Sequence, residues 1–188
     1  MSCGSEKTGS NVEDQGEARL VVDLLFLDEE TCAPCGGTAK TLTEAENILR
    51  EPLKALGVAL EIRKIHVVDA KVAIAERFVS SPTIRVAGVD IDPARTEDNC
   101  PSCGTITGDA VSVTCRSWHW RGEVFQAAPV GKIVESVLSQ ARRIQNSDCC
   151  ESSCCGGVED AQMAEPYVMP QNLVSFFEAR AAQLKLAC

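Results

Sequence analysis

The chain has 188 residues, of which 45% are hydrophobic and 24% charged, and its formal net charge is -9. This length fits one domain with appendages, and the acidic balance argues against nucleic acid or an anionic membrane as a partner. The most apolar run, Leu20–Leu27, is too short to cross a bilayer and contains Asp23.

Cysteine is the unusual part of the composition, with eleven residues. Residues 1–17 are polar, predict disorder and carry no secretory signal. We therefore expect a cytoplasmic protein whose thiols are kept reduced. The odd cysteine count and the length of the chain also argue against a disulfide scaffold, which leaves metal or metalloid binding, redox chemistry, or both.

Strands and helices alternate in the first half of the chain, which predicts an α/β sandwich with a central sheet. Apolar residues recur at helical spacing after Thr31, in a helix that Pro52 kinks or restarts and Gly57 ends. The expected elements, in order, are a buried strand at 18–28, this helix, a strand at 58–68, a short helix at 70–78, and a strand at 80–91 that turns near Gly88 and continues as a second short strand.

The second half predicts a loop, a hairpin and two more helices. Residues 92–109 are polar and loop-like, residues 110–128 form a hairpin that turns at Arg121–Gly122, and residues 129–144 form an amphipathic helix. The resulting division is a domain at 18–145, a cysteine-rich linker at 146–169 and an amphipathic helix at 170–188. That last helix must dock on its own core or on a partner.

Cys32 and Cys35 form a Cys-x-x-Cys pair between the first strand and the first helix. Free backbone N–H groups at a helix start stabilise a thiolate. We therefore expect Cys32 to be the exposed nucleophile and Cys35 the resolving thiol or second ligand. The acidic residues Asp28, Glu29 and Glu30 would oppose thiolate formation at Cys32 if they lay close to it.

Three sequence features together resemble the thioredoxin-like superfamily over residues 18–145. They are Cys32–Cys35, the Ser81–Thr83 step and the Trp118–Glu123 hairpin, and the match looks closest to an uncharacterised thioredoxin-like family of unknown function. The resemblance implies a thioredoxin-like sandwich with a mixed sheet and an extra hairpin. It also implies a cis peptide at Pro82 that faces the cysteine pair and shapes a substrate site.

Cys100 and Cys103 form a second Cys-x-x-Cys, followed by a glycine, in a turn. Such a knuckle suits a tetrahedral ion, with Cys115 as a third thiol and His119 as a weaker candidate for the fourth ligand. Four ligands would indicate Zn(II), whereas three thiols would suit a trigonal ion such as As(III). A second redox pair that serves Cys32 and Cys35, or unrelated thiols, are the alternatives.

Two vicinal cysteine pairs, Cys149–Cys150 and Cys154–Cys155, lie in a segment with few apolar residues. Adjacent Cα atoms are about 3.8 Å apart, which is too close for an ordinary disulfide, and thiolates select soft ions. The pairs are similar to those near the C-terminus of arsenic metallochaperones. We interpret them as a capture arm for a soft ion.

The sequence thus favours a cytoplasmic thiol protein that binds or transfers a soft metal or metalloid ion, with As(III) first and Hg(II), Cu(I) or Zn(II) as competitors. Its partners would be the ion and a protein thiol or a metal efflux or transfer protein. The alternative is a thiol–disulfide oxidoreductase in which Cys32 attacks, Cys35 resolves and the tail thiols relay electrons.

Overall fold

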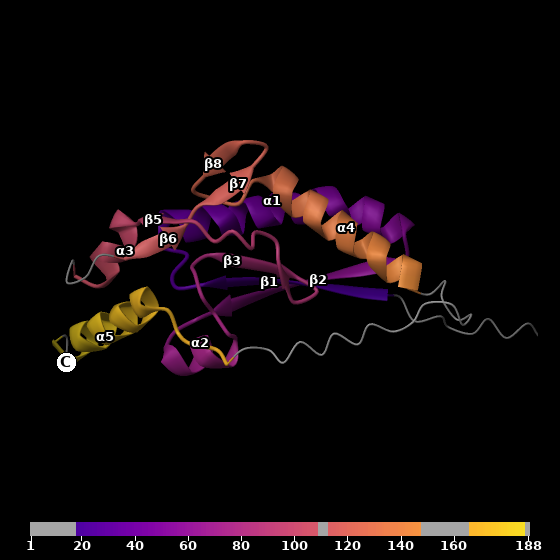
Figure 1. Cartoon of the computed structure of the whole chain (residues 1–188). Coiled ribbons are helices and arrows are strands. Elements are labelled where there is room, and N and C mark those ends of the chain that lie inside the picture. The colour runs from indigo at the N-terminus through magenta and orange to yellow at the C-terminus, as the bar shows by residue number, and fades with distance from the viewer. Residues whose placement is uncertain (1–17, 109–112, 148–165, 187–188) are drawn as a thin grey trace, which may run out of the picture.

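The computed structural model describes residues 18–108, 113–147 and 166–186, and these form a mixed α/β fold (Figure 1). The elements in chain order are β1 (Ala18–Phe26), α1 (Ala33–Ala55), β2 (Val58–His66), α2 (Ala70–Ala75), β3 (Thr83–Val86), β4 (Val89–Asp90), β5 (Glu97–Asn99), α3 (Pro101–Ile106), β6 (Thr114–Arg116), β7 (Trp118–Trp120), β8 (Glu123–Phe125), α4 (Val130–Ser147) and α5 (Gln171–Leu186).

A four-stranded mixed sheet in the order β2-β1-β3-β4 forms the centre of the fold. β1 pairs in parallel with β2 and antiparallel with β3, and β3 pairs antiparallel with β4. Because β1 has a neighbour on both edges and helices over both faces, its sequence is a nearly continuous apolar run rather than an alternation. The predicted α/β class with a mixed central sheet is confirmed.

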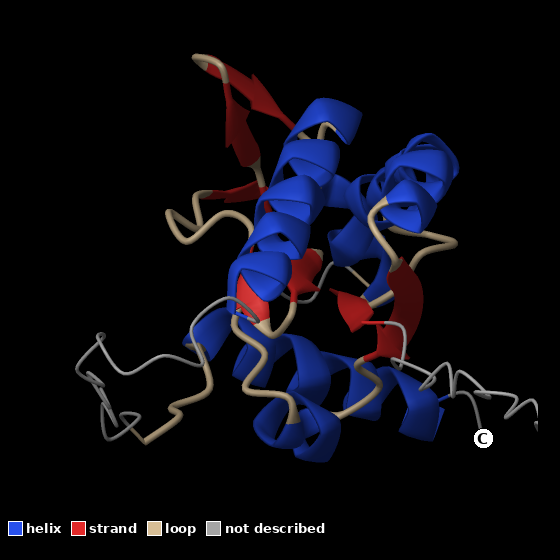
Figure 2. Cartoon of the chain, turned by 90° about the vertical axis from the view of Figure 1, so that its right-hand side faces the viewer, coloured by secondary structure: helices blue, strands red, loops and turns tan. Residues whose placement is uncertain are grey.

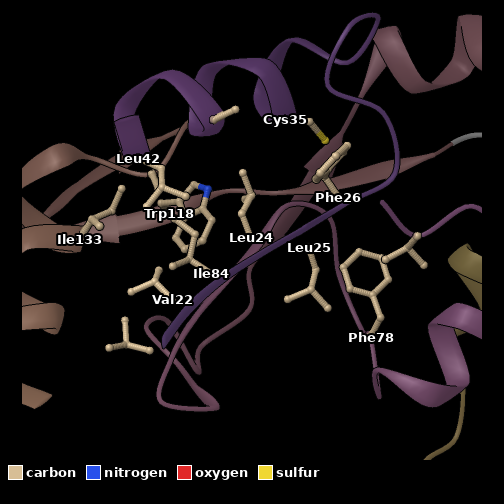
Figure 3. Close-up of a cluster of buried hydrophobic side chains, with 14 of the residues drawn as sticks. Val22, Leu24, Leu25, Phe26, Cys35, Leu42, Phe78, Ile84, Trp118 and Ile133 are labelled. Atoms are coloured by element: carbon tan, nitrogen blue, oxygen red, sulfur yellow. The ribbon is translucent and has the colours of Figure 1, made fainter. Parts of the chain in front are cut away.

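Helices cover both faces of this sheet. α1 and α4 lie together on one face, and α2 and α5 lie on the other (Figures 1 and 2). α1 continues through Pro52 and ends before Gly57, whose φ of 65° is the left-handed conformation expected of a glycine at this position. The core between α1, α4 and the sheet contains Leu24, Leu42 and Trp118, all buried (Figure 3).

The segment between β4 and α4 differs from its prediction. The expected loop contains β5 and α3, and β6 pairs with β5 instead of joining the hairpin. β5 is three polar residues long and α3 has six residues, so neither is long enough to show a hydrophobic period. The predicted hairpin is confirmed only for β7 and β8, with Arg121 and Gly122 at φ of 51° and 82°, as a two-residue turn of this kind requires.

α5 docks on its own chain. Leu173 and Phe176 are buried in the main core, and the Tyr167 hydroxyl just before the helix donates a hydrogen bond to the Phe78 carbonyl. Leu184, which the helical spacing places on the same face, is 64% exposed, so the apolar contact is confined to the first half of the helix.

Polar contacts extend the docking of α5 to the small β5–β6 sheet and to α3. Asn172 Nδ2 donates hydrogen bonds to Glu97 Oε2 at 2.9 Å and to Thr114 Oγ1 at 3.0 Å, and Gln183 Nε2 donates to the Thr107 carbonyl at 3.2 Å. None of the helices in the described part of the chain is both long and apolar enough to cross a membrane.

Replacing Phe176 should show whether α5 is integral to the fold. We expect Phe176→Ala to lower the free energy of unfolding by about 3–5 kcal/mol, because it leaves a cavity in the core, and Phe176→Leu to lower it by less. The control Leu184→Ala should change it by less than about 0.5 kcal/mol. Equal effects of Phe176→Ala and Leu184→Ala in urea unfolding would contradict the docking.

Candidate metal centre

Four cysteine sulfur atoms converge at the end of the molecule where α1 begins. They belong to Cys32, Cys100, Cys103 and Cys115, and all four lie within 4.8 Å of one another. The sulfur–sulfur distances include 3.2 Å for Cys103–Cys115, 3.7 Å for Cys32–Cys115 and 4.0 Å for Cys32–Cys100. The sulfur atoms of Cys100, Cys103 and Cys115 therefore converge, as we predicted. The fourth side chain of the cluster is Cys32 and not His119.

Two of the thiols occupy equivalent places at the start of a helix. Cys32 is the N-cap of α1 and Cys100 is the N-cap of α3, and each helix has a proline in its first turn. A proline here has no N–H to leave unpaired and pre-sets the helical φ. Cys103 lies one turn into α3, and its backbone N–H donates a hydrogen bond to the Cys100 carbonyl at 3.1 Å.

The loop before Cys32 is shaped by its acidic residues. Asp28 Oδ1 accepts hydrogen bonds from the backbone N–H groups of Glu30 and Thr31, at 3.0 and 2.6 Å, and the Glu29 carboxylate pairs with Lys64. The loop also lies so close to α1 that a Cβ atom on Gly36 would be 2.6 Å from the Glu29 carbonyl oxygen. The carboxylates of Asp28 and Glu29 thus bind backbone N–H groups and Lys64. The conformation of the loop places Cys32 in the cluster.

Cys115 is held by its neighbour Arg116, a residue that the sequence analysis did not single out. The fully buried guanidinium of Arg116 donates to both Asp90 carboxylate oxygens, at 3.0 and 2.8 Å, and to the Asp92 carbonyl at 2.9 Å. The backbone N–H of Arg116 donates to the Ser81 carbonyl at 2.7 Å. These bonds fasten β6 to the central sheet, and no local pattern in the sequence signals them.

Cys35 does not belong to the four-sulfur cluster. Its thiol is fully buried, lies 3.3 Å from Ser81 Oγ and points from α1 toward Phe26 in Figure 3. The peptide bond between Ser81 and Pro82 is cis, as we predicted, and both residues are buried beside the cysteine pair. Ser81 Oγ also accepts a hydrogen bond from the Leu27 backbone N–H.

The expectation that Cys32 is the exposed thiol is wrong, because Cys32 is only 1% exposed. Its close contacts with the Cys100 and Cys103 thiols raise the pKa of Cys32 to about 12, whereas hydrogen bonds from the Cys103 and Cys115 thiols lower the pKa of Cys100. Contacts with the Cys100, Cys103 and Cys32 thiols, together with burial, raise the pKa of Cys115. One thiolate at Cys100 makes a second negative charge beside it unfavourable unless a cation is bound.

The remaining sequence candidates are not part of the cluster. His119 is exposed, and its backbone N–H donates to Asp92 Oδ2. Cys149, Cys150, Cys154 and Cys155 lie outside the described residues, so their role as a capture arm stays a prediction. The sequence analysis did not place Cys32 with Cys100, Cys103 and Cys115, because it treated the two Cys-x-x-Cys motifs separately. Their shared signal, a cysteine followed within two residues by proline at a helix start, was present in both.

The raised pKa predicts low reactivity of Cys32 in the folded, metal-free protein. At about pH 8 the Cys32 thiol should be alkylated by iodoacetamide more slowly than a free thiol, whose pKa is about 8.5, because Cys32 is buried and protonated below a pKa of about 12. Mass spectrometric mapping of the alkylated residues over a pH series would measure this. Faster reaction of Cys32 than of a model thiol would restore the nucleophile interpretation.

Comparison with known protein families gives a match over most of the described domain. The model of the family described as Domain of unknown function (DUF2703) matches residues 20–137, which include Cys32, Cys35 and the Cys100–Cys115 segment but not the tail cysteines. The search of curated proteins finds no match, and neither does the search of solved structures. Because the match spans more than half of the chain, the protein belongs to the DUF2703 family.

Proposed function

We propose that the protein binds one soft metal ion through Cys32, Cys100, Cys103 and Cys115, and that Zn(II) fits the site best. The observation that carries this proposal is the convergence of the four sulfur atoms. Zinc–sulfur bonds of about 2.3 Å place tetrahedral sulfur ligands about 3.8 Å apart. The sulfur–sulfur distances of 3.2, 3.7 and 4.0 Å fall on both sides of that value.

The number of thiols favours a tetrahedral ion over a trigonal one. Four sulfur ligands in a tetrahedron suit Zn(II) or iron, whereas a trigonal As(III) ion would leave one of the four thiols unused. The four cysteines of an iron–sulfur cluster are divided among two or more iron atoms, so they do not all lie as close together as the ligands of a single ion. As(III), which the sequence favoured, Hg(II) and Cu(I) thus become competitors of Zn(II) for this site.

Burial of all four ligands supports a closed site. Their exposed fractions do not exceed 4%, and sites with four protein ligands serve structure or storage, whereas catalytic zinc keeps a position for water. The ion would join the start of α1 to α3 and β6, which are far apart in the sequence. It would also supply the positive charge that lets the clustered thiols ionise together.

Thiol–disulfide exchange is the second candidate function. The place of Cys32 and Cys35 as a Cys-x-x-Cys pair at the start of α1 favours it, because redox pairs have this spacing and position. The attacking thiol of such a pair must also be accessible and ionised, and here Cys32 is 1% exposed with a raised pKa. Metal binding therefore accounts for more of the geometry.

The wider proposal places this site on a thioredoxin-like fold in the cytoplasm. The β1–α1–β2 unit followed by the antiparallel β3–β4 pair, and the cis Ser81–Pro82 bond beside Cys35, support the fold assignment. The tail thiols would capture the ion and a protein thiol or efflux partner would receive it. We propose no membrane or nucleic acid partner.

Substitution of single cysteines tests the ligand set. We expect the wild-type protein to bind one Co(II) ion in the cluster, with the intense visible absorption of tetrahedral cobalt thiolate. Loss of one ligand, as in Cys32→Ser, Cys103→Ser or Cys115→Ser, should weaken Co(II) affinity by more than about tenfold. Even replacement of a residue that only hydrogen-bonds to a metal ligand lowers metal affinity by about 10–100-fold. The matched control Cys35→Ser should retain the ion and the spectrum.

Replacement of all four tail cysteines by serine keeps the cluster signal separate from any binding by the tail. A wild-type protein that takes up no tetrahedral Co(II), Zn(II) or Cd(II) would overturn the proposed function. An equal loss of Co(II) affinity in Cys32→Ser and Cys35→Ser would overturn this ligand set.

Removal of the ion should destabilise the end of the molecule that holds the cluster. An ion that binds only the folded state adds about 2.7 kcal/mol at a free concentration 100 times its dissociation constant. A chelator should therefore lower the thermal midpoint and speed hydrogen exchange in β5, α3 and β6, and leave β1 protected. An unchanged midpoint after complete removal of the metal would contradict a structural contribution of the ion.

A further inference from the structure

The four cluster cysteines are not equally shielded from solvent. Cys100 and Cys115 are 4% and 3% exposed, whereas Cys32 is 1% exposed and Cys103 is fully buried. The slight exposure of the first two coincides with a hollow of about 60 Å³ that both residues line. Within the described part of the chain, the side of the cluster formed by Cys100 and Cys115 is therefore the more accessible one.

The walls of this hollow are rigid and its rim is polar. Pro34 and Pro101, which follow Cys32 and Cys100 at the starts of α1 and α3, line it, and their fixed φ limits how far these walls can move. Asp98 of β5 and Gln126 after β8 also line it and are exposed. Water and small polar molecules thus reach the hollow from solvent.

We propose that this hollow is the exchange route for the bound ion, and that a low-molecular-weight thiol is the ligand it admits. The inference rests on the proposed ion site. A volume of about 10–15 Å³ for each water position means that the hollow holds a few waters, which is room for a sulfur atom and its first carbons but not for a folded protein. A soft ion held by thiolates is displaced most readily by another thiolate.

The exchange is a ligand substitution with no change of oxidation state. An incoming thiol would form a metal–sulfur bond while the bond from the ion to Cys100 would break. The proton of the incoming thiol would pass to the Cys100 sulfur, which would become a neutral thiol. The same substitution at Cys115, on the same side of the cluster, and then at Cys32 and Cys103 would break the remaining two protein bonds and release the ion, bound to external thiolates, through the hollow.

Two substitutions at Gln126 separate an exchange route from a general loss of stability. Gln126→Trp fills the hollow and should slow zinc loss at least fivefold, whereas Gln126→Ala widens it and should speed zinc loss. The matched control Val124→Trp lies on the same hairpin, at a residue that is 60% exposed and does not line the hollow. It should leave the rate within twofold of the wild type.

The measurement is the rate at which the zinc-loaded 188-residue chain transfers its ion to a chromogenic chelator, with free cysteine added as the thiol. The rate should rise in proportion to the cysteine concentration and should not respond to S-methylcysteine, which has no thiol. The equilibrium affinity for zinc should be the same in all variants, because none of them removes a ligand.

Equal rates in the Gln126 variants, or changes in the same direction in both, would overturn the exchange route while zinc binding itself stands. A zinc-transfer rate that depends on the chelator concentration but not on the cysteine concentration would contradict the proposal that a thiol is the exchanging ligand. Absence of zinc from the wild-type protein after loading would instead contradict the proposed function. The number of zinc ions bound per chain is therefore measured before any transfer rate.

Discussion

Four buried sulfur atoms within 4.8 Å of one another are the constraint on which the site depends. Thiols this close cannot all ionise in a medium of low dielectric constant, because each thiolate raises the cost of the next. The pKa of Cys100 is lowered and that of Cys115 is raised, as expected where one thiol ionises and its neighbours stay protonated. A bound cation removes this cost, which is why the arrangement is easier to explain as an ion site than as a set of neutral core residues.

The fold holds the cluster together from two sides. The loop after β1 places Cys32 at the start of α1, with Asp28 occupied by backbone N–H groups. On the other side, buried Arg116 bridges Asp90 and the segment around Ser81, so β6 and Cys115 are fixed to the edge of the central sheet. α5 reinforces this arrangement through Asn172, which contacts both β5 and β6.

One motif serves two purposes in this chain. Cys32 contributes to the four-sulfur cluster, while Cys35 turns into the core and contacts Ser81 beside the cis proline. A Cys-x-x-Cys pair at a helix start is commonly a redox pair, yet here the partners of Cys32 come from a second Cys-x-x-Cys and from a strand. The burial that makes Cys32 a poor nucleophile makes it a suitable ligand in a closed site.

The sequence by itself determined the periodic elements and the kinds of residue that carry the chemistry. Long apolar patterns predicted β1, α1, β2 and α4 because a helix or strand of that length repeats its period several times. Thiol spacing predicted a soft-ion site at Cys100, Cys103 and Cys115. Only the tertiary structure decided that Cys32 joins these three thiols in one cluster, since 68 residues separate it from Cys100. The same holds for the pairing of β5 with β6 and for the burial of Arg116, because these depend on contacts between segments distant in sequence, which no local pattern records.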